Sequence, residues 1–320
     1  MPKPLVSINM LTYNQQEFIT EAIKGVLMQK TNFPFKLVIG EDCSTDGTRE
    51  IVYEYLKNYP KQIKVIASEN NVGSRINELR TLEACTGKYI AFCEGDDYWT
   101  DIHKLQKQVD FLEGNPDYGL VHGDVDHLDD KSGEITRAFN KKNNITIPNG
   151  DIFDFLMKPS HSIKTTTVCI RKEILEKYYL SNEEIMQSDW ALIDISIWLT
   201  FAYHSKIYYL DEVMATYRLL QKSMSRNINP KKNYQFHQLI NSIRTYFINN
   251  YDCSDETRVM IETNKYKSIL SDAYGMNDIV LAKSAMRQLK NNDVRIGLKL
   301  RFRYLAVKFP FIKYLIDLFR

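Results

Sequence analysis

The chain has 320 residues and a mass of 37.5 kDa, enough for one large domain or two ordinary ones. Its hydrophobic fraction of 44% and charged fraction of 26% are those of a globular protein and exclude a disordered or low-complexity chain. The net charge is +2, which gives no indication of nucleic-acid binding. Residues 295–320 depart from this balance, because they carry a net charge of +6 against −4 for the rest.

The cysteines and the apolar runs both point to the cytoplasm. Five cysteines are present and none forms a C-x-x-C pair, so neither a disulfide framework nor a zinc knuckle is indicated. The longest strongly apolar run, residues 195–203, is far shorter than the ~20 residues that span a bilayer, and no secretory leader is evident. We therefore expect a cytoplasmic protein.

The first hundred residues alternate predicted strands and helices. Apolar runs predict strands at 6–12, 35–40, 63–67 and 89–93, and residues at helical spacing predict helices between them. This alternation indicates an α/β fold with a mostly parallel central sheet and helices on both faces.

The rest of the chain is mixed and then helical. We expect a helix near 104–112, a strand at 119–122, a polar loop to 149, a strand at 165–171 and a helix over 188–203. From 229 to about 290 the apolar residues recur at helical spacing, which predicts a small C-terminal region of two or three helices. The predicted domains are therefore 1–225, 226–294 and a basic tail, 295–320.

Three polar clusters follow predicted strands: Thr12–Asn14, Glu41–Asp42 and Glu94–Asp97. In parallel sheets ligands bind at the carboxyl ends of the strands, so we expect these clusters to form one site. The cluster EGDDYW (94–99) places three carboxylates within four residues, and they repel one another unless a cation lies among them. Such oxygens suit Mg²⁺ or Mn²⁺. Taken alone, a solvated acidic turn explains the string equally well.

In EDCSTDGT (41–48) two aspartates have different predicted roles. Asp42, at the strand end, is placed to accept hydrogen bonds from a base or a ribose. Asp46 precedes Gly47, Thr48 and a helix, which predicts a turn or N-cap.

The strings VSINMLTYN, EDCSTDGT, NNVG and TGKYIAFCEGDDYW occur in an order and spacing that resembles the inverting glycosyltransferases of family 2. These enzymes share a nucleotide-diphospho-sugar-binding fold of the GT-A type, and the resemblance covers residues 4–225. It implies that Thr12, Tyr13 and Asp42 hold the nucleoside, most often uridine.

The resemblance also assigns the acidic cluster. Glu94 and Asp96 match the outer residues of the family's DxD-type motif, and Asp97 stands beside them. Because glutamate is longer than the commoner aspartate, we expect Glu94 to contact the ribose. Asp96 and Asp97 would then hold the metal, Mn²⁺ or Mg²⁺.

In the family, a carboxylate at the start of an apolar helix is the general base for the acceptor hydroxyl, and Asp189 matches that place. A positioned carboxylate helps because an alcohol is a poor nucleophile until its proton is removed. Asp189 can also be read as a helix N-terminal charge favoured by the helix dipole. Asp194, five residues further on, is a competitor.

Three more residues are candidates for substrate contacts. Trp99 and Trp190 each adjoin a proposed site acid and can stack on a sugar, although a buried core is the default for tryptophan. The family often has Tyr-Arg-x-His near the end of the domain, where this chain has Leu220 in place of the histidine. Arg218 either compensates for that loss or pairs with an acid.

The tail has two interpretations. Basic side chains adjoin an apolar stripe of Leu298, Phe302, Leu305 and Phe309. Such a segment (296–320) can lie on an anionic membrane, on the inner face, or can pack on the helical region.

The resemblance therefore implies a metal-dependent hexosyl- or N-acetylhexosaminyltransferase. It would move one sugar, with inversion, from a nucleotide-diphosphate donor such as a UDP-sugar to a hydroxyl of a glycan or lipid-linked acceptor, as in surface polysaccharide or lipopolysaccharide assembly. Two alternatives stay open. A sugar-nucleotide nucleotidyltransferase should have a glycine-rich phosphate loop after the first strand, and LTYNQQEF has no glycine. A non-catalytic nucleotide-sugar-binding protein is the other.

Overall fold

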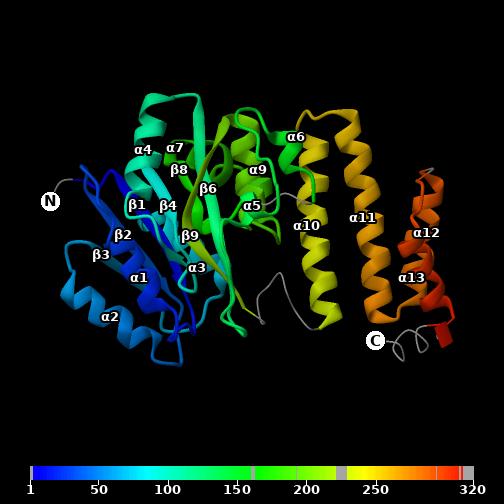
Figure 1. The fold of residues 1–320 in the computed structure, drawn as a ribbon, viewed down its shortest axis with the longest axis horizontal. Coiled ribbons are helices and arrows are strands. Elements are labelled where there is room, and N and C mark those ends of the chain that lie inside the picture. Colours follow the sequence, from blue (N-terminus) through cyan, green and yellow to red (C-terminus); the bar gives the residue numbers. More distant parts are fainter. Residues whose placement is uncertain are drawn as a thin grey trace. The chain divides into compact units, whose positions relative to one another are not determined.

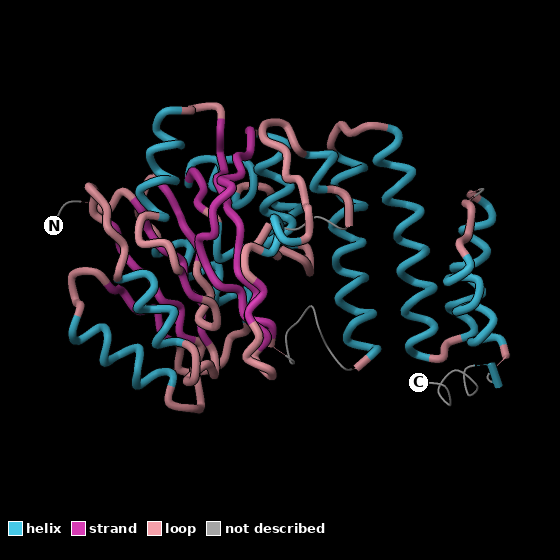
Figure 2. The backbone as a smooth tube through the Cα atoms, in the orientation of Figure 1, coloured by secondary structure: helices cyan, strands magenta, loops and turns pink. Residues whose placement is uncertain are grey.

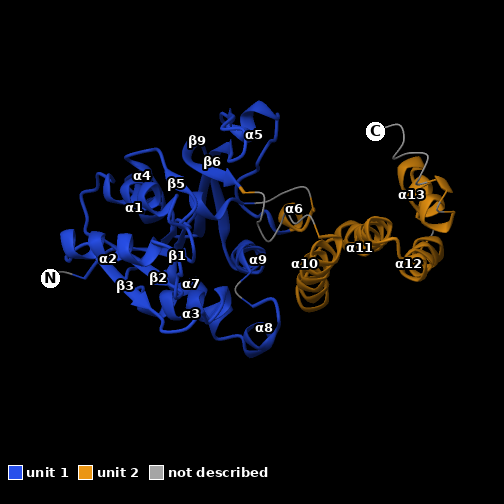
Figure 3. Ribbon diagram, turned by 90° about the horizontal axis from the view of Figure 1, so that it is seen from below, with its two compact units in different colours: residues 1–153, 162–219 blue, residues 154–161, 220–320 orange. Residues whose placement is uncertain are grey.

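The chain forms two compact units (Figure 3). The computed structural model describes residues 3–159, 163–191, 193–220, 229–292, 294–309 and 311–312. Unit 1 comprises Met1–Phe153 and Ser162–Leu219, and unit 2 comprises Asp154–His161 and Leu220–Arg320. The sequence predicts boundaries after 225 and 294; in the structure the division falls after 219, residues 154–161 join unit 2, and 298–308 form a helix of that unit.

Unit 1 contains a nine-stranded sheet (Figures 1 and 2). Its strands are β1 (Val6–Thr12), β2 (Phe35–Glu41), β3 (Ile63–Ala67), β4 (Tyr89–Phe92), β5 (Tyr98–Trp99), β6 (Tyr118–Asp129), β7 (Ile135–Thr136), β8 (Cys169–Arg171) and β9 (Lys206–Leu219). The strand order is β3-β2-β1-β4-β8-β6-β9-β5, with β7 beside β6. The first four strands are parallel, β6 and β9 are parallel to each other, and β8 joins the two parallel sets by antiparallel pairing.

The helices of unit 1 lie between these strands in the chain (Figure 1). They are α1 (Ile19–Leu27), α2 (Thr48–Asn58), α3 (Ser74–Ala84), α4 (Lys104–Gly114), α5 (Phe139–Lys142), α7 (Lys172–Ile174), α8 (Glu183–Gln187) and α9 (Asp194–His204), with a 3-10 turn η1 (Thr165–Thr167) and a π-helical turn η2 (Leu175–Leu180). Helix α6 (Phe153–Leu156) crosses the boundary between the units. The predicted α/β architecture is confirmed.

The two faces of the parallel strands differ in polarity because successive side chains of a strand point to opposite sides. Ile8 and Met10 of β1 belong to an apolar core shared with α1, α2 and α4. The alternate residue Asn9 instead donates to Glu78 of α3 at 2.6 Å. The face covered by α3 therefore carries polar groups directly behind the strand ends.

Two predicted elements have different bounds in the structure. The strand expected at 119–122 continues to Asp129, because β6 pairs with β9 along its length and α5 covers it. Asp124 fixes α5 by accepting the backbone N–H of Asn140 at 2.9 Å. The helix expected over 188–203 begins only at Asp194, and Asp189 lies in a turn before it.

Unit 2 consists of α10 (Pro230–Asn250), α11 (Asp255–Met276), α12 (Ile279–Asn291) and α13 (Leu298–Lys308). The first three begin at side-chain caps, where Asn229, Ser254 and Asp278 accept backbone N–H groups of the first turn. Leu270, Leu289 and neighbouring apolar residues of α11–α13 form its core. None of the helices in the described part of the chain is both long and apolar enough to cross a membrane.

A lysine is enclosed in the core of unit 1. The Lys104 ammonium lies 4.1 Å from the centre of the Trp99 ring and donates to Gln108 Oε1 at 2.8 Å. Its side chain is fully buried, and burial lowers the pKa of Lys104 to about 8. A lysine whose pKa is lowered on folding makes stability depend on pH, because the unfolded chain keeps its proton over a range where the folded chain has released it.

We therefore predict that the free energy of unfolding rises between pH 8 and 10.5, by about 3 kcal/mol from this group. Lys104→Met removes this rise, whereas Lys57→Met, at an exposed position of α2, retains it. Urea unfolding of the three proteins across this pH range measures the difference. Parallel curves for wild type and Lys104→Met would show that Lys104 does not titrate in this range.

Candidate active site

The predicted convergence of the three polar clusters is confirmed. Strand β1 pairs in parallel with β2 on one side and with β4 on the other, so the carboxyl ends of all three meet at one edge of the sheet. The loops after β1 and β2 are also tied together. Asn14 Oδ1 accepts the backbone N–H of Thr45 at 2.8 Å, and Thr48 Oγ1 accepts that of Gln15 at 2.8 Å.

Asp46 has the structural role expected of it. Its Oδ1 accepts the backbone N–H of Thr48, the first residue of α2, at 2.9 Å, and its Oδ2 accepts that of Gln16 at 3.1 Å. Burial raises the pKa of this carboxyl, but the hydrogen bonds from Thr48 and Gln16 outweigh it and hold the pKa below its usual value.

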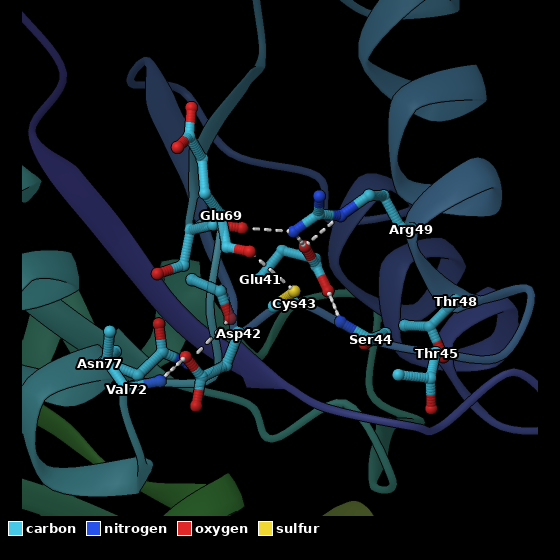
Figure 4. Close-up of polar contacts among 12 residues, drawn as sticks. Glu41, Asp42, Cys43, Ser44, Thr45, Thr48, Arg49, Glu69, Val72 and Asn77 are labelled. Atoms are coloured by element: carbon cyan, nitrogen blue, oxygen red, sulfur yellow. Dashed lines mark hydrogen bonds and ion pairs between the residues drawn. The ribbon is translucent and has the colours of Figure 1, made fainter.

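Glu41 and Asp42 hold the loops around the end of β2 (Figure 4). Glu41 accepts the backbone N–H of Ser44 at 2.6 Å and pairs with Arg49 at 2.5 Å. The carboxylate of Asp42 accepts the N–H groups of Val72 and Gly73 at 2.8 and 2.9 Å. Since each carboxylate oxygen can accept two hydrogen bonds, Asp42 keeps acceptor capacity for a nucleoside while it fixes the NNVG loop.

The acidic cluster follows β4 directly. Asp97 is buried, and its Oδ1 accepts the backbone N–H of Arg218 at 2.8 Å, while Arg218 Nε donates to the carbonyl of Asp96 at 2.9 Å. Burial raises the pKa of Glu94, Asp96 and Asp97, and the negative charge of Asp96 raises it further at Glu94 and Asp97. The three carboxyl groups are therefore close enough to oppose one another's ionisation.

Oxygen atoms without partners surround this cluster. Within the described residues, Glu94 Oε2, Thr12 Oγ1 and Gln15 Oε1 are buried and lack a hydrogen bond. Gly95 allows the strand ends to approach, because a Cβ there would come within 3.0 Å of Thr12 Oγ1. Buried polar atoms normally have partners, so these three oxygens indicate that a ligand with positive charge or hydrogen-bond donors belongs here.

The donor set fits a divalent cation. Carboxylate oxygens are the preferred ligands of Mg²⁺ and Mn²⁺, which bind one or two carboxylates together with substrate phosphates. No group of three His, Cys, Asp or Glu side chains in the described ranges is arranged to hold a metal by itself. Within the described ranges, the protein alone therefore does not form a complete metal site.

Tyr217 of β9 faces the same carboxylates. Burial, followed by the negative charges of Asp97 and Glu94, raises the pKa of Tyr217 to about 12, so its hydroxyl stays protonated at neutral pH. The Lys164 ammonium lies 4.8 Å from the centre of the Tyr217 ring. Tyr217 thus lies near both a cation and the acidic cluster.

Asp194, the first residue of α9, completes the group. Its Oδ2 accepts the Thr165 hydroxyl at 3.1 Å, and its Oδ1 accepts its own helix's Ile195 N–H at 2.7 Å. Asp194 is an exposed residue, but partial desolvation of its carboxyl group raises its pKa, and its charge in turn raises the pKa of Glu94. The helix-start carboxylate near the acidic cluster is thus Asp194. Asp189, which the sequence predicts for that place, is also exposed and lies in the preceding turn.

Both predicted tryptophan contacts require correction. Trp99 is 1% exposed, and its indole N–H donates to the carbonyl of Thr166 at 2.8 Å. Trp190 is 7% exposed. Neither ring has an open face for a sugar. Tyr13, by contrast, is 44% exposed beside the strand ends.

Arg218 pairs with acids, which was one of its two predicted roles. Its guanidinium meets Glu21 at 2.6 Å and lies 3.9 Å from Asp130. The side chain is mostly buried and lies 4.6 Å from the centre of the Phe18 ring. Arg218 is therefore held by the protein rather than free to reach a substrate.

Comparison with known proteins identifies the class. The profile of Glycosyl transferase family 2 matches residues 7–179. The putative teichuronic acid biosynthesis glycosyltransferase TuaG of Bacillus subtilis is 31% identical over 232 residues, which cover 70% of this chain and 83% of TuaG. The chain belongs to glycosyl transferase family 2.

One relative with higher identity is matched over a shorter segment. An uncharacterized protein of Mycobacterium tuberculosis, Rv1520, is 45% identical over 112 residues, which is 35% of this chain. The match spans only about a third of that relative's length, 32%.

Solved structures confirm the GT-A fold. S. aureus TarS 1–349 in complex with UDP-GlcNAc has a TM-score of 0.60 at 17% identity and covers 94% of this chain and 79% of its own. The mannosyltransferase PcManGT of Pyrobaculum calidifontis, in complex with GDP-Man and Mn²⁺, has a TM-score of 0.60 at 15% identity, with 98% and 84% covered.

Proposed function

We propose that this protein is a metal-dependent inverting glycosyltransferase that moves a single sugar from a nucleotide-diphosphate donor, a UDP-sugar, to a hydroxyl of a glycan or lipid-linked acceptor. The observation that carries the proposal is the group of Glu94, Asp96 and Asp97 after the carboxyl end of β4, with Asp194 of α9 near Glu94 and unpartnered oxygens beside them. Family membership, the UDP-GlcNAc bound to TarS and the name of TuaG support it.

The donor would lie along the ends of β1, β2 and β4. In this proposal Thr12, Tyr13 and Asp42 bind the nucleoside, and Glu94 binds the ribose. Asp96, with Asp97 beside it, would hold a divalent ion, as the Mn²⁺ of PcManGT suggests; such an ion neutralises the charge of a departing diphosphate. The buried Arg218 keeps Asp96 and Asp97 in place, because its backbone N–H donates to the Asp97 carboxylate and its Nε donates to the Asp96 carbonyl.

Asp194 is the proposed general base. Its carboxylate is oriented by Thr165 and by the start of α9, and it stands near the acidic cluster where donor and acceptor would meet. Removal of the acceptor proton lets the hydroxyl oxygen attack the anomeric carbon opposite the diphosphate, which departs with the bonding electrons. Attack from that side inverts the configuration, so an α-linked donor would yield a β-linked product.

Replacement of the metal-binding residue tests the donor site. Asp96→Ala is expected to abolish transfer and to remove the Mn²⁺-dependent part of UDP binding, because the remaining oxygens cannot hold the ion. Calorimetric titration of UDP with and without Mn²⁺ measures this. Asp130→Ala, an exposed acid that Arg218 merely approaches, serves as the control. Unchanged metal-dependent UDP binding by Asp96→Ala would contradict the assignment of Asp96 as a metal ligand. Slow hydrolysis of UDP-sugars by the wild type would show that the protein is an enzyme and not only a nucleotide-sugar-binding protein.

A second pair of variants tests the base. Asp194→Asn is expected to lower turnover by ~10²–10⁴-fold, the usual contribution of a general base, while UDP-sugar affinity changes little. Asp189→Asn is the matched control, an aspartate five residues away that we expect to keep turnover near wild type. Steady-state kinetics and donor titration measure both. The opposite pattern would make Asp189 the base, as the sequence alone suggests.

We further propose that the C-terminal region binds an anionic membrane surface through α13. Leu298, Phe302, Leu305 and Phe309 are between 40% and 83% exposed along one side of this helix. The other side packs on α11 and α12 through Ala306 and Val307. The helix is thus packed in unit 2 and still presents the apolar stripe, with Lys299, Arg301 and Lys308 beside it; residues 310 and 313–320 of the predicted tail lie outside the described ranges.

The paired change Phe302→Glu and Leu305→Glu tests this surface. It is expected to release the protein from vesicles with anionic lipids, because insertion is lost and the added charges oppose attraction worth ~1 kcal/mol per basic residue. Val280→Glu, at an exposed apolar position of α12, should bind as wild type. Vesicle co-sedimentation at low and high salt measures both. Wild-type protein that ignores the vesicles at low salt would contradict the proposal.

A further inference from the structure

A cavity of about 600 Å³ lies within unit 2, between α10, α11 and the segment at Lys158. Its volume is in the range of small-molecule sites. His237, Asn241 and Arg244 of α10 line it, and their spacing of four and three residues places them on one side of the helix. Met260 and Asn264, four residues apart on α11, face them.

Arg244 is the central observation. Its side chain is 8% exposed, yet within the described part of the chain its Nε has no hydrogen-bond partner and no ion pair includes its guanidinium. Burial lowers the pKa of Arg244 to about 10, which leaves it charged at neutral pH. An unpaired buried charge strongly destabilises a folded protein. The presence of Arg244 at this position therefore indicates a ligand that pairs with its charge.

Two neighbouring amides also lack acceptors. The Nδ2 of Asn241 and the Nε2 of Gln238, one helical turn apart on α10, are buried and without a partner among the described residues. Of the two amides, Asn241 lines the cavity together with Arg244, so two donors without partners border it, which calls for a ligand that offers acceptors. Buried donors are otherwise nearly always satisfied.

The charge around the cavity selects an anion. Lys158 and Arg244 line it, and none of the described residues that line it is an aspartate or glutamate. His237 pairs with Asp272 at 2.8 Å, and this hydrogen bond raises the pKa of His237. Phe236, Ile240 and Met260 form an apolar part of the wall. The ligand should therefore combine an oxyanion with an apolar body.

We propose that this cavity binds an organic phosphate with an apolar substituent, its phosphate oxygens accepting from Arg244 and Asn241. Phosphate is favoured because it offers several acceptor oxygens to the guanidinium fork and the amide together. The site lies wholly in unit 2 and is separate from the nucleotide-sugar site of unit 1. It stands whether or not the proposed transfer reaction is correct.

Titration calorimetry of the full chain with hexyl phosphate tests this site, with inorganic phosphate and 1-hexanol as partial ligands. Saturable binding of hexyl phosphate is expected, with weaker binding of either partial ligand. Arg244→Met should raise the Kd by about tenfold to hundredfold, the value of a charged hydrogen bond. Lys232→Met, at an exposed position of the same helix, should leave the Kd unchanged.

The same variant gives a readout that does not depend on the ligand. Without phosphate, Arg244→Met should have a higher Tm than wild type, because an unpaired buried charge is replaced by an apolar side chain of similar length. Asn241→Leu is the second variant, and it should weaken binding as well. Absence of saturable hexyl phosphate binding by wild type, or unchanged affinity in both variants, would overturn the proposal. Equal affinity for inorganic phosphate would overturn the role of the apolar wall.

Discussion

The active site depends on the way Arg218 holds a set of carboxyl groups that repel one another. Its backbone N–H binds Asp97, its Nε binds the carbonyl of Asp96, and its remaining nitrogens meet Glu21 of α1 and approach Asp130 after β6. One residue at the end of β9 thus joins the acidic turn to a helix on one side and to a strand end on the other. Because these contacts exist in the free protein, the carboxylates are already positioned before a donor arrives, and binding need not supply the energy to gather them.

Much of the fold follows from periodicity in the sequence. The strands at 6–12 and 63–67 are predicted at the same bounds that the structure has, and those at 35–40 and 89–93 agree within a residue, because each is an apolar run closed by polar residues. The extension of β6 to Asp129 could not be found in this way. Its Asp124 and Asp126 are polar residues inside a buried strand, and they are stabilised by α5, whose position only the folded chain reveals.

The residues of the candidate site also fall into those that the sequence predicts and those that it does not. Residues that closely follow a strand, such as Asp42 and Asp96, can be recognised from their position after an apolar run in the sequence. Residues that reach the site from distant segments are not: Lys164 and Thr165 precede β8, and Tyr217 lies near the end of β9. The predicted start of the helix at residue 188 was wrong because an apolar run was read as one helix from its first residue. The structure inserts a turn, and the helix-start position passes to Asp194.

The pairing of β6 with β9 bears on how unit 1 is made. It joins residues 118–129 to 206–219, so the strand that carries Arg218 leaves the ribosome about ninety residues after its partner. Until then Asp96 and Asp97 have no counter-ion from β9, and the acidic turn lacks the contacts that offset its repulsion. A nascent chain that stops before residue 218 contains β1–β4 but lacks the contacts that Arg218 makes with Asp96 and Asp97. Synthesis of β9, the last strand of the unit, is therefore the step that supplies these contacts.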